Sequence, residues 1–193
     1  WHPGYGLALT EASEYDELKG YASTGGAAAV TEAHVASQRP LIEGIHRLLV
    51  ATASRPPSLG CFGLHEWAMV YQDDATRHPL PLRLGASGTN AVVDSHKVAC
   101  SHFDAFRFFT PTARPLNTLS PGRDDRPDFE QPGCLHASMD LYKHAYRLSP
   151  LIPSELVADC LELAIAVREV DMRASPYDLS SLDYTAIPIE TAA

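Results

Sequence analysis

The sequence predicts an α+β fold, mostly helical, in a single domain that covers residues 1–193. Apolar residues recur with the helical period in several stretches of the chain, as is typical of amphipathic helices. The segment 80–109 is instead rich in β-branched and aromatic residues, which favours a small sheet there. The chain is also long enough to bury a sizeable core.

The first third of the chain is expected to lead from an irregular segment into a helix. Residues 1–30 are rich in Gly and Ala and show little periodicity apart from a short helix expected near residues 14–21. Thr31 is a suitable N-cap for a helix that begins at Glu32. The prolines in the segment 55–57 end that helix.

The middle of the chain changes in character. A helix over residues 61–72 is apolar nearly all round, so we expect it at the centre of the core. Residues 79–85 read as a short strand, and residues 89–93 as a short helix. The segment 97–109 has the composition of one or two further strands.

The last part of the chain is expected to form a loop and two helices. Residues 110–132 contain five prolines and predict a long extended loop. Helices follow at residues 133–148 and 155–172, the second with Ser154 as its N-cap. From Ser175 onward the chain looks extended.

Charge and cysteine content limit the functional classes. With 24 acidic and 15 basic residues the net charge is −9, and we expect no extensive nucleic-acid surface. Four cysteines without a C-x-x-C pair argue against a zinc ribbon and favour reduced thiols in a cytoplasmic protein. No apolar run approaches the roughly 20 residues of a membrane span. The chain starts at Trp1 without a methionine, so we expect an upstream segment to be missing.

Histidines and carboxylates gather in the middle of the chain, where four histidines lie between residues 61 and 104. Such groups bind transition metals and transfer protons near neutral pH. The first pair, His65 and Glu66, lies in the apolar helix, where a carboxylate needs a partner. It is not the zincin motif H-E-x-x-H, because Met69 stands where the second histidine is required.

The second pair is His102 and Asp104. On a strand, residues two apart share a face, so these side chains would converge as part of a two-histidine, one-carboxylate iron site or a zinc site. His96 is a candidate third ligand, and His136, which shares a helix face with Asp140, is a further one. The alternative is a buried histidine that is hydrogen-bonded to a nearby aspartate.

Arginines bracket this region and suggest an anionic substrate, because guanidinium binds carboxylate or phosphate in a bidentate manner. Arg83 and Arg107 are the candidates. Arg107 lies among phenylalanines, where a charge needs a partner. It either anchors a substrate or pairs with Glu66 or Asp104, and the sequence leaves both alternatives open.

The segments CFGLHEWAMVY, RHPLPLRLG, SHFDAFRFFTPTARPLN and PGCLHASMDLYKHAYRLSPL resemble a family of actinobacterial proteins catalogued as 3-methyladenine DNA glycosylases. The resemblance covers essentially the whole chain. It implies cleavage of the N-glycosidic bond to an alkylated base without a metal, and it carries over no catalytic residue. An enzyme of this kind needs an aromatic pocket, which Trp67 and Tyr71 would help to build, and a carboxylate, either Glu66 or Asp104.

From the residues alone, the leading hypothesis is that the protein is a metal-dependent enzyme. A divalent iron or zinc ion would activate water or dioxygen on a small anionic or polar substrate, with Glu66 or Asp104 as the catalytic carboxylate. The alternatives are a DNA glycosylase and a non-enzymatic binding or subunit protein whose histidines are structural. No membrane partner is expected. The predicted metal ligands are His65, His96, His102, Asp104 and His136, and the predicted substrate-binding residues are Arg83, Arg107, Trp67 and Tyr71.

Overall fold

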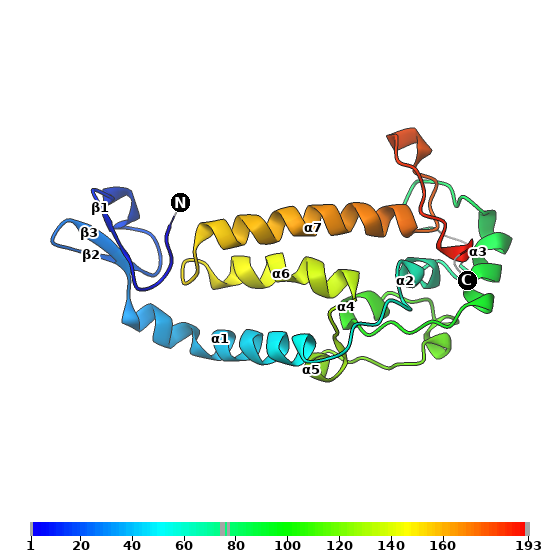
Figure 1. The fold of residues 1–193 in the computed structure, drawn as a ribbon, viewed down its shortest axis with the longest axis horizontal. Helices are drawn as coiled ribbons and strands as arrows, with labels where there is room; N and C mark the ends of the chain where they lie inside the picture. The colour runs from blue at the N-terminus through cyan, green and yellow to red at the C-terminus, as the bar shows by residue number, and fades with distance from the viewer. Residues whose placement is uncertain (1, 74–75, 77, 192–193) are drawn as a thin grey trace. The chain divides into compact units, whose positions relative to one another are not determined.

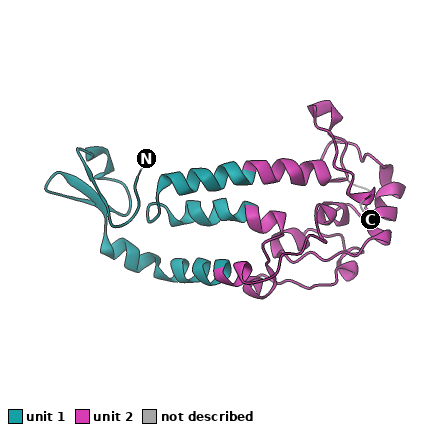
Figure 2. Cartoon of the chain, in the orientation of Figure 1, with its two compact units in different colours: residues 1–49, 139–164 teal, residues 50–138, 165–193 magenta. Residues whose placement is uncertain are grey.

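The computed structural model describes residues 2–73, 76 and 78–191. It confirms the α+β class, because most of the regular structure is helical and the chain also forms one small antiparallel sheet (Figure 1). The chain divides into two compact units, whose residues are coloured in Figure 2. Unit 1 comprises residues 1–49 and 139–164, and unit 2 comprises residues 50–138 and 165–193. These boundaries fall inside helices, so no change of composition marks them.

Unit 1 carries the sheet. Its strands β1 (Ala8–Thr10), β2 (Tyr21–Thr24) and β3 (Ala27–Val30) pair antiparallel in the order β1-β3-β2. Gly25 and Gly26 both have positive φ, 62° and 80°, and join β2 to β3. A Gly-Gly pair supplies the twist that a two-residue hairpin requires. The prediction of an irregular segment at residues 1–30 was therefore wrong, because this turn allows the Ala-rich strands to pair.

The long helices were predicted correctly. They are α1 (Glu32–Ala53), α6 (Leu135–Leu148) and α7 (Ser154–Ala174), and each begins in one unit and continues into the other. The Thr31 hydroxyl accepts a hydrogen bond from the His34 amide at 3.1 Å, as expected of an N-cap. Among the residues described, no helix has both the length and the apolar character needed to cross a membrane.

Unit 2 is built from short helices and extended segments. No strand forms between residues 80 and 109, where only Leu82 makes an isolated bridge, to Tyr177. The prediction of a sheet there was wrong for two reasons. Residues 85–95 are helical, and the extended segment at Cys100 is held by the side chain of Asn117, which bonds both its amide and its carbonyl. The helices are α2 (Leu64–Ala68), α3 (Gly85–Ser95), α4 (Phe103–Phe106) and α5 (Arg126–Phe129).

Helix α2 occupies the centre of unit 2, as predicted from its apolar sequence. Trp67 and Ala68 are fully buried, and α2 packs on α3 and α4. The helix is shorter than the predicted 61–72, because Gly63 adopts a left-handed conformation (φ 70°) directly before it. The loop predicted at residues 110–132 is present, with α5 and the 3-10 turn Arg114–Leu116 as its regular elements.

The end of α7 packs tightly against α2. The indole N–H of Trp67 donates to the carbonyl of Ala174 at 2.9 Å. A Cβ atom on Gly63 would lie 2.6 Å from the Cβ of Ala174, so only glycine fits at this approach. These contacts bring His65, on α2, close to the last turn of α7, where the candidate site forms.

Candidate metal centre

Three side chains from three helices converge in unit 2. His65 comes from α2, His136 from the first turn of α6, and Asp171 from the last turn of α7. One potential ligand atom of each lies within 4.8 Å of the other two. His65 and Asp171 are buried, and the rings of His65 and His136 meet edge-on with centroids 4.5 Å apart.

Each of the three residues has one buried atom that lacks a hydrogen-bond partner among the described residues. These atoms are Nε2 of His65, Nδ1 of His136 and Oδ1 of Asp171. His65 Nε2 and Asp171 Oδ1 are 3.1 Å apart and form an ion pair when His65 is protonated. Adjacent ligand atoms at about 2.1 Å from one ion lie about 3.0 Å apart in octahedral geometry and about 3.4 Å apart in tetrahedral geometry. The residues therefore fit a small metal ion.

The charges of the three groups are coupled. Burial disfavours the protonated form of His65, but the Asp171 carboxylate outweighs it and raises the pKa of His65 to about 9. Burial and the neighbouring positive charge of His65 lower the pKa of His136 to about 3. Burial opposes ionisation of Asp171, yet His65 more than offsets it and keeps that pKa below its usual value. Without a metal the centre thus holds a charged His65, a neutral His136 and an ionised Asp171.

Arg168 lies behind Asp171 and orients it. Its Nη1 atom donates to Oδ2 of Asp171 at 2.9 Å and lies 3.6 Å from Oε1 of Glu66. This leaves Oδ1 of Asp171 directed at the histidines. Partners that hold a ligating carboxylate in this way are common around protein metal sites.

A small cavity adjoins the two histidines of the cluster. Cys61, Cys100 and Cys134 line it together with His65 and His136, and Sγ of Cys61 is 3.8 Å from Nδ1 of His65. Hydrogen bonding to Cys61 outweighs burial and lowers the pKa of Cys100 to about 6, whereas burial raises the pKa of Cys134 to about 12. Thiols are therefore near the centre, although they are not part of the three-residue cluster.

His102 lies beside the cluster. Its ring centroid is 5.4 Å from that of His136, but its Nε2 atom lies 3.6 Å from Oε1 of Glu130 and 3.5 Å from the guanidinium of Arg126. Arg126 and Glu130 also form a short ion pair. His102 thus belongs to a buried network next to the candidate centre.

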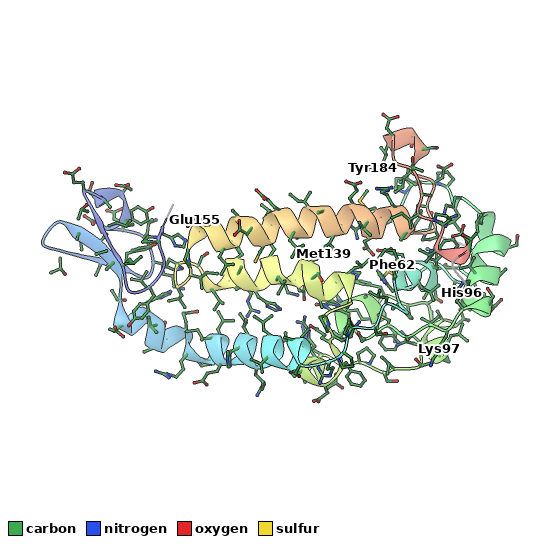
Figure 3. The ribbon with its side chains drawn as sticks, viewed as in Figure 1. Phe62, His96, Lys97, Met139, Glu155 and Tyr184 are labelled. Atoms are coloured by element: carbon green, nitrogen blue, oxygen red, sulfur yellow. The ribbon has the colours of Figure 1, made fainter. Side chains whose placement is uncertain are left out.

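Two of the predicted ligands lie elsewhere. His96 follows α3, where its Nδ1 is 2.8 Å from the carbonyl of Val92 (Figure 3). Asp104 is half-exposed on α4 and pairs with Arg107 at 3.2 Å. Because residues 103–106 are helical, the argument that His102 and Asp104 share a strand face was wrong.

The predicted substrate-binding residues already have protein partners. Arg83 forms a bidentate ion pair with Glu190 and stacks on Trp67, 4.8 Å from the ring centroid. Arg107 lies over the ring of Phe108 in addition to its contact with Asp104. The last of them, Tyr71, is buried and donates to Asp94 at 2.6 Å.

Sequence reasoning missed Asp171 and Arg168. The signal for Asp171 was its position in the periodicity of α7, since it lies four residues after Val167 and three before Ala174. At that spacing Asp171 lies on the same apolar face of α7 as Val167 and Ala174. A carboxylate is almost never buried on such a face unless it has a partner. Glu66, in contrast, was correctly expected to need a partner, which is Arg168.

Comparisons with known proteins found no matching family model, no matching curated protein and no matching solved structure. The resemblance to glycosylases therefore stays a prediction.

Proposed function

We propose that this protein is a metal-dependent enzyme in which His65, His136 and Asp171 hold one divalent iron or zinc ion. The observation that carries the proposal is the convergence of His65, His136 and Asp171, each of which also has a buried atom without a hydrogen-bond partner among the described residues. Buried polar atoms are nearly always satisfied in proteins, so an unsatisfied group of three needs an explanation. A bound cation supplies one.

The donor set indicates the kind of metal. Two imidazoles and one carboxylate suit iron(II) in oxygenases and zinc(II) in hydrolases, and with three protein ligands a position stays open. When bound, such an ion would activate water or dioxygen. A closed structural zinc site would instead require a fourth protein ligand.

The surrounding residues have roles that follow from their contacts. Arg168 would hold the Asp171 carboxylate in the orientation that binding requires. Glu66 is not among the three clustered groups but lies beside Arg168, so it is the candidate general base. The four cysteines are free, which supports a reducing compartment such as the cytoplasm as the proposed location.

Cobalt(II) substitution tests the open position directly. The metal-stripped protein is titrated with cobalt(II), and its visible spectrum is recorded before and after addition of azide. An open centre on His65, His136 and Asp171 predicts visible bands that are stronger than those of the aqueous ion and that change when azide binds. The matched control is His96→Ala, which removes an imidazole outside the cluster and should leave the spectrum unchanged.

Two other results would contradict the proposal. An intense near-ultraviolet charge-transfer band would show that Cys61, Cys100 or Cys134 ligates the ion, as in a structural site. Cobalt spectra identical to those of the free aqueous ion would show that no site exists.

A further inference from the structure

A second cavity of unit 2 is lined by Arg168 and Glu66. Its volume is about 110 Å³, below that of sites for drug-sized ligands, so only a small molecule fits. We infer that this cavity binds a small molecule with an anionic head group, a carboxylate or phosphate, on a short apolar body. The inference deepens the proposed function, on which it rests, because it names the substrate class of the same centre.

The apolar lining of the cavity would bind the apolar part of such a ligand. Leu80, Met172, Leu179 and Leu182 line it, and Tyr177 adds an aromatic surface. Most of the exposed lining is therefore hydrocarbon, and a short alkyl or aryl group would be removed from water there.

The guanidinium of Arg168 would bind the anionic head group of the ligand. Both of its contacts, to Asp171 and to Glu66, are made through Nη1. Its Nε and Nη2 atoms make no hydrogen bond within the described part of the chain, and its side chain is 45% exposed. One edge of the guanidinium is thus available for the bidentate contact that carboxylates and phosphates make.

Glu66 also lines the cavity and determines how strongly an anion binds. Its carboxylate is 12% exposed and lies 3.6 Å from Arg168, a distance too long for a hydrogen bond. A like charge so close weakens anion binding, and its removal strengthens it. The cavity therefore predicts opposite effects for the two charged residues.

The site also links ligand and centre. Arg168 contacts Asp171 through Nη1 and also lines the cavity, so a head group bound to Arg168 lies one residue away from the proposed metal ligand. Arg83 and Arg107, which the sequence suggested for this role, are both paired with carboxylates of the chain.

Four probes with the same alkyl chain test the inference: hexanoate, hexyl phosphate, hexylamine and hexan-1-ol. Binding to the purified protein is followed by NMR titration. The anionic probes should bind at least about tenfold more tightly than hexylamine, since charge-assisted hydrogen bonds are the strong ones. The ratio of hexanoate to hexyl phosphate identifies the head group.

Three variants complete the experiment. Arg168→Gln should weaken hexanoate binding about tenfold or more, and Glu66→Gln should strengthen it. Arg173→Gln is the matched control, because Arg173 lies on the same helix but pairs with Glu169 and does not line the cavity. It should bind hexanoate like the wild type.

A stronger response to hexylamine, or hexanoate binding that is unchanged in Arg168→Gln, would overturn the inference. Failure of the proposed function would look different. His136→Ala removes a proposed metal ligand without touching Arg168, so this variant should lose metal and keep hexanoate binding. A metal-free wild-type protein that binds hexanoate would leave the cavity assigned and the metal centre refuted.

Discussion

Nε2 of His65 lies 3.1 Å from Oδ1 of Asp171. Both side chains are buried, so water does not separate the two charged groups. Two adjacent ligands of one metal ion lie a similar distance apart, so the pair fits such a centre.

Removal of any one of the three proposed ligands should greatly weaken metal binding. We expect His65→Ala, His136→Ala and Asp171→Ala each to lower zinc affinity by more than about 100-fold, since loss of even an outer partner costs 10–100-fold. Competition against a chelating dye measures this. His96→Ala, outside the cluster, should bind zinc like the wild type, and equal losses in all four variants would count against the assignment.

Metal binding should release a proton. The pKa of His65 is raised to about 9, so His65 is protonated at pH 7.5 in the metal-free protein and must lose its proton to act as a ligand. Affinity should therefore rise about tenfold per pH unit between pH 7 and 8.5. Calorimetry in two buffers of different ionisation enthalpy counts the protons released, and an affinity independent of pH in this range would contradict the expectation.

The same pKa predicts how the stability of the metal-free protein depends on pH. A folded-state pKa raised from 6.5 to about 9 contributes stability that is fully present below pH 6.5 and is lost as the pH rises through 9. The change amounts to about 3 kcal/mol. Urea unfolding at pH 6 and pH 9.5 measures it. Asp171→Asn should abolish most of this dependence, and a wild-type protein equally stable at both values would be inconsistent with it.

The buried pair next to His102 should be important for stability. Glu130→Gln removes the buried counter-charge of Arg126 and should cost about 3 kcal/mol in the free energy of unfolding. Glu169→Gln is the matched control, because its pair with Arg173 is largely exposed and should contribute less than about 0.5 kcal/mol. Equal effects of the two changes would contradict the proposed importance of burial.

Gly63 should be essential for the approach of α2 to α7. An alanine there combines a strained φ of 70° with a 2.6 Å contact to the Cβ of Ala174, so we expect a loss of about 3 kcal/mol or more. Gly85→Ala isolates the backbone cost, because Gly85 has φ 62° and no atom near its Cβ position. That control should lose only about 1 kcal/mol. Similar losses in both variants would show that the contact is unimportant.

Much of the helical fold could be predicted, because caps and apolar periodicity are local properties. Thr31 and Ser154 mark the starts of α1 and α7 within one residue. The sheet could not be placed from composition. Residues 97–109 have the composition of strands, but the backbone hydrogen bonds of this segment go to other partners, such as the side chain of Asn117 at Cys100.

The candidate site could be predicted only in part. His65 and His136 were identified as candidate ligands from residue type and apolar surroundings, which are visible in the sequence. Their partner Asp171 is more than thirty residues from either, and its approach depends on the packing of Gly63 against Ala174. No local pattern encodes that contact. The spacing argument for Asp104 failed because it assumed a strand.

The metal content of the purified protein is the most direct test of the central claim. The full-length protein is expressed in medium containing iron and zinc, purified without chelators, and analysed by elemental mass spectrometry alongside Asp171→Ala. We predict close to one iron or zinc ion per chain in the wild type and almost none in the variant. A properly folded wild-type protein that contains no transition metal, and takes up none when iron(II) or zinc(II) is added, would contradict the account.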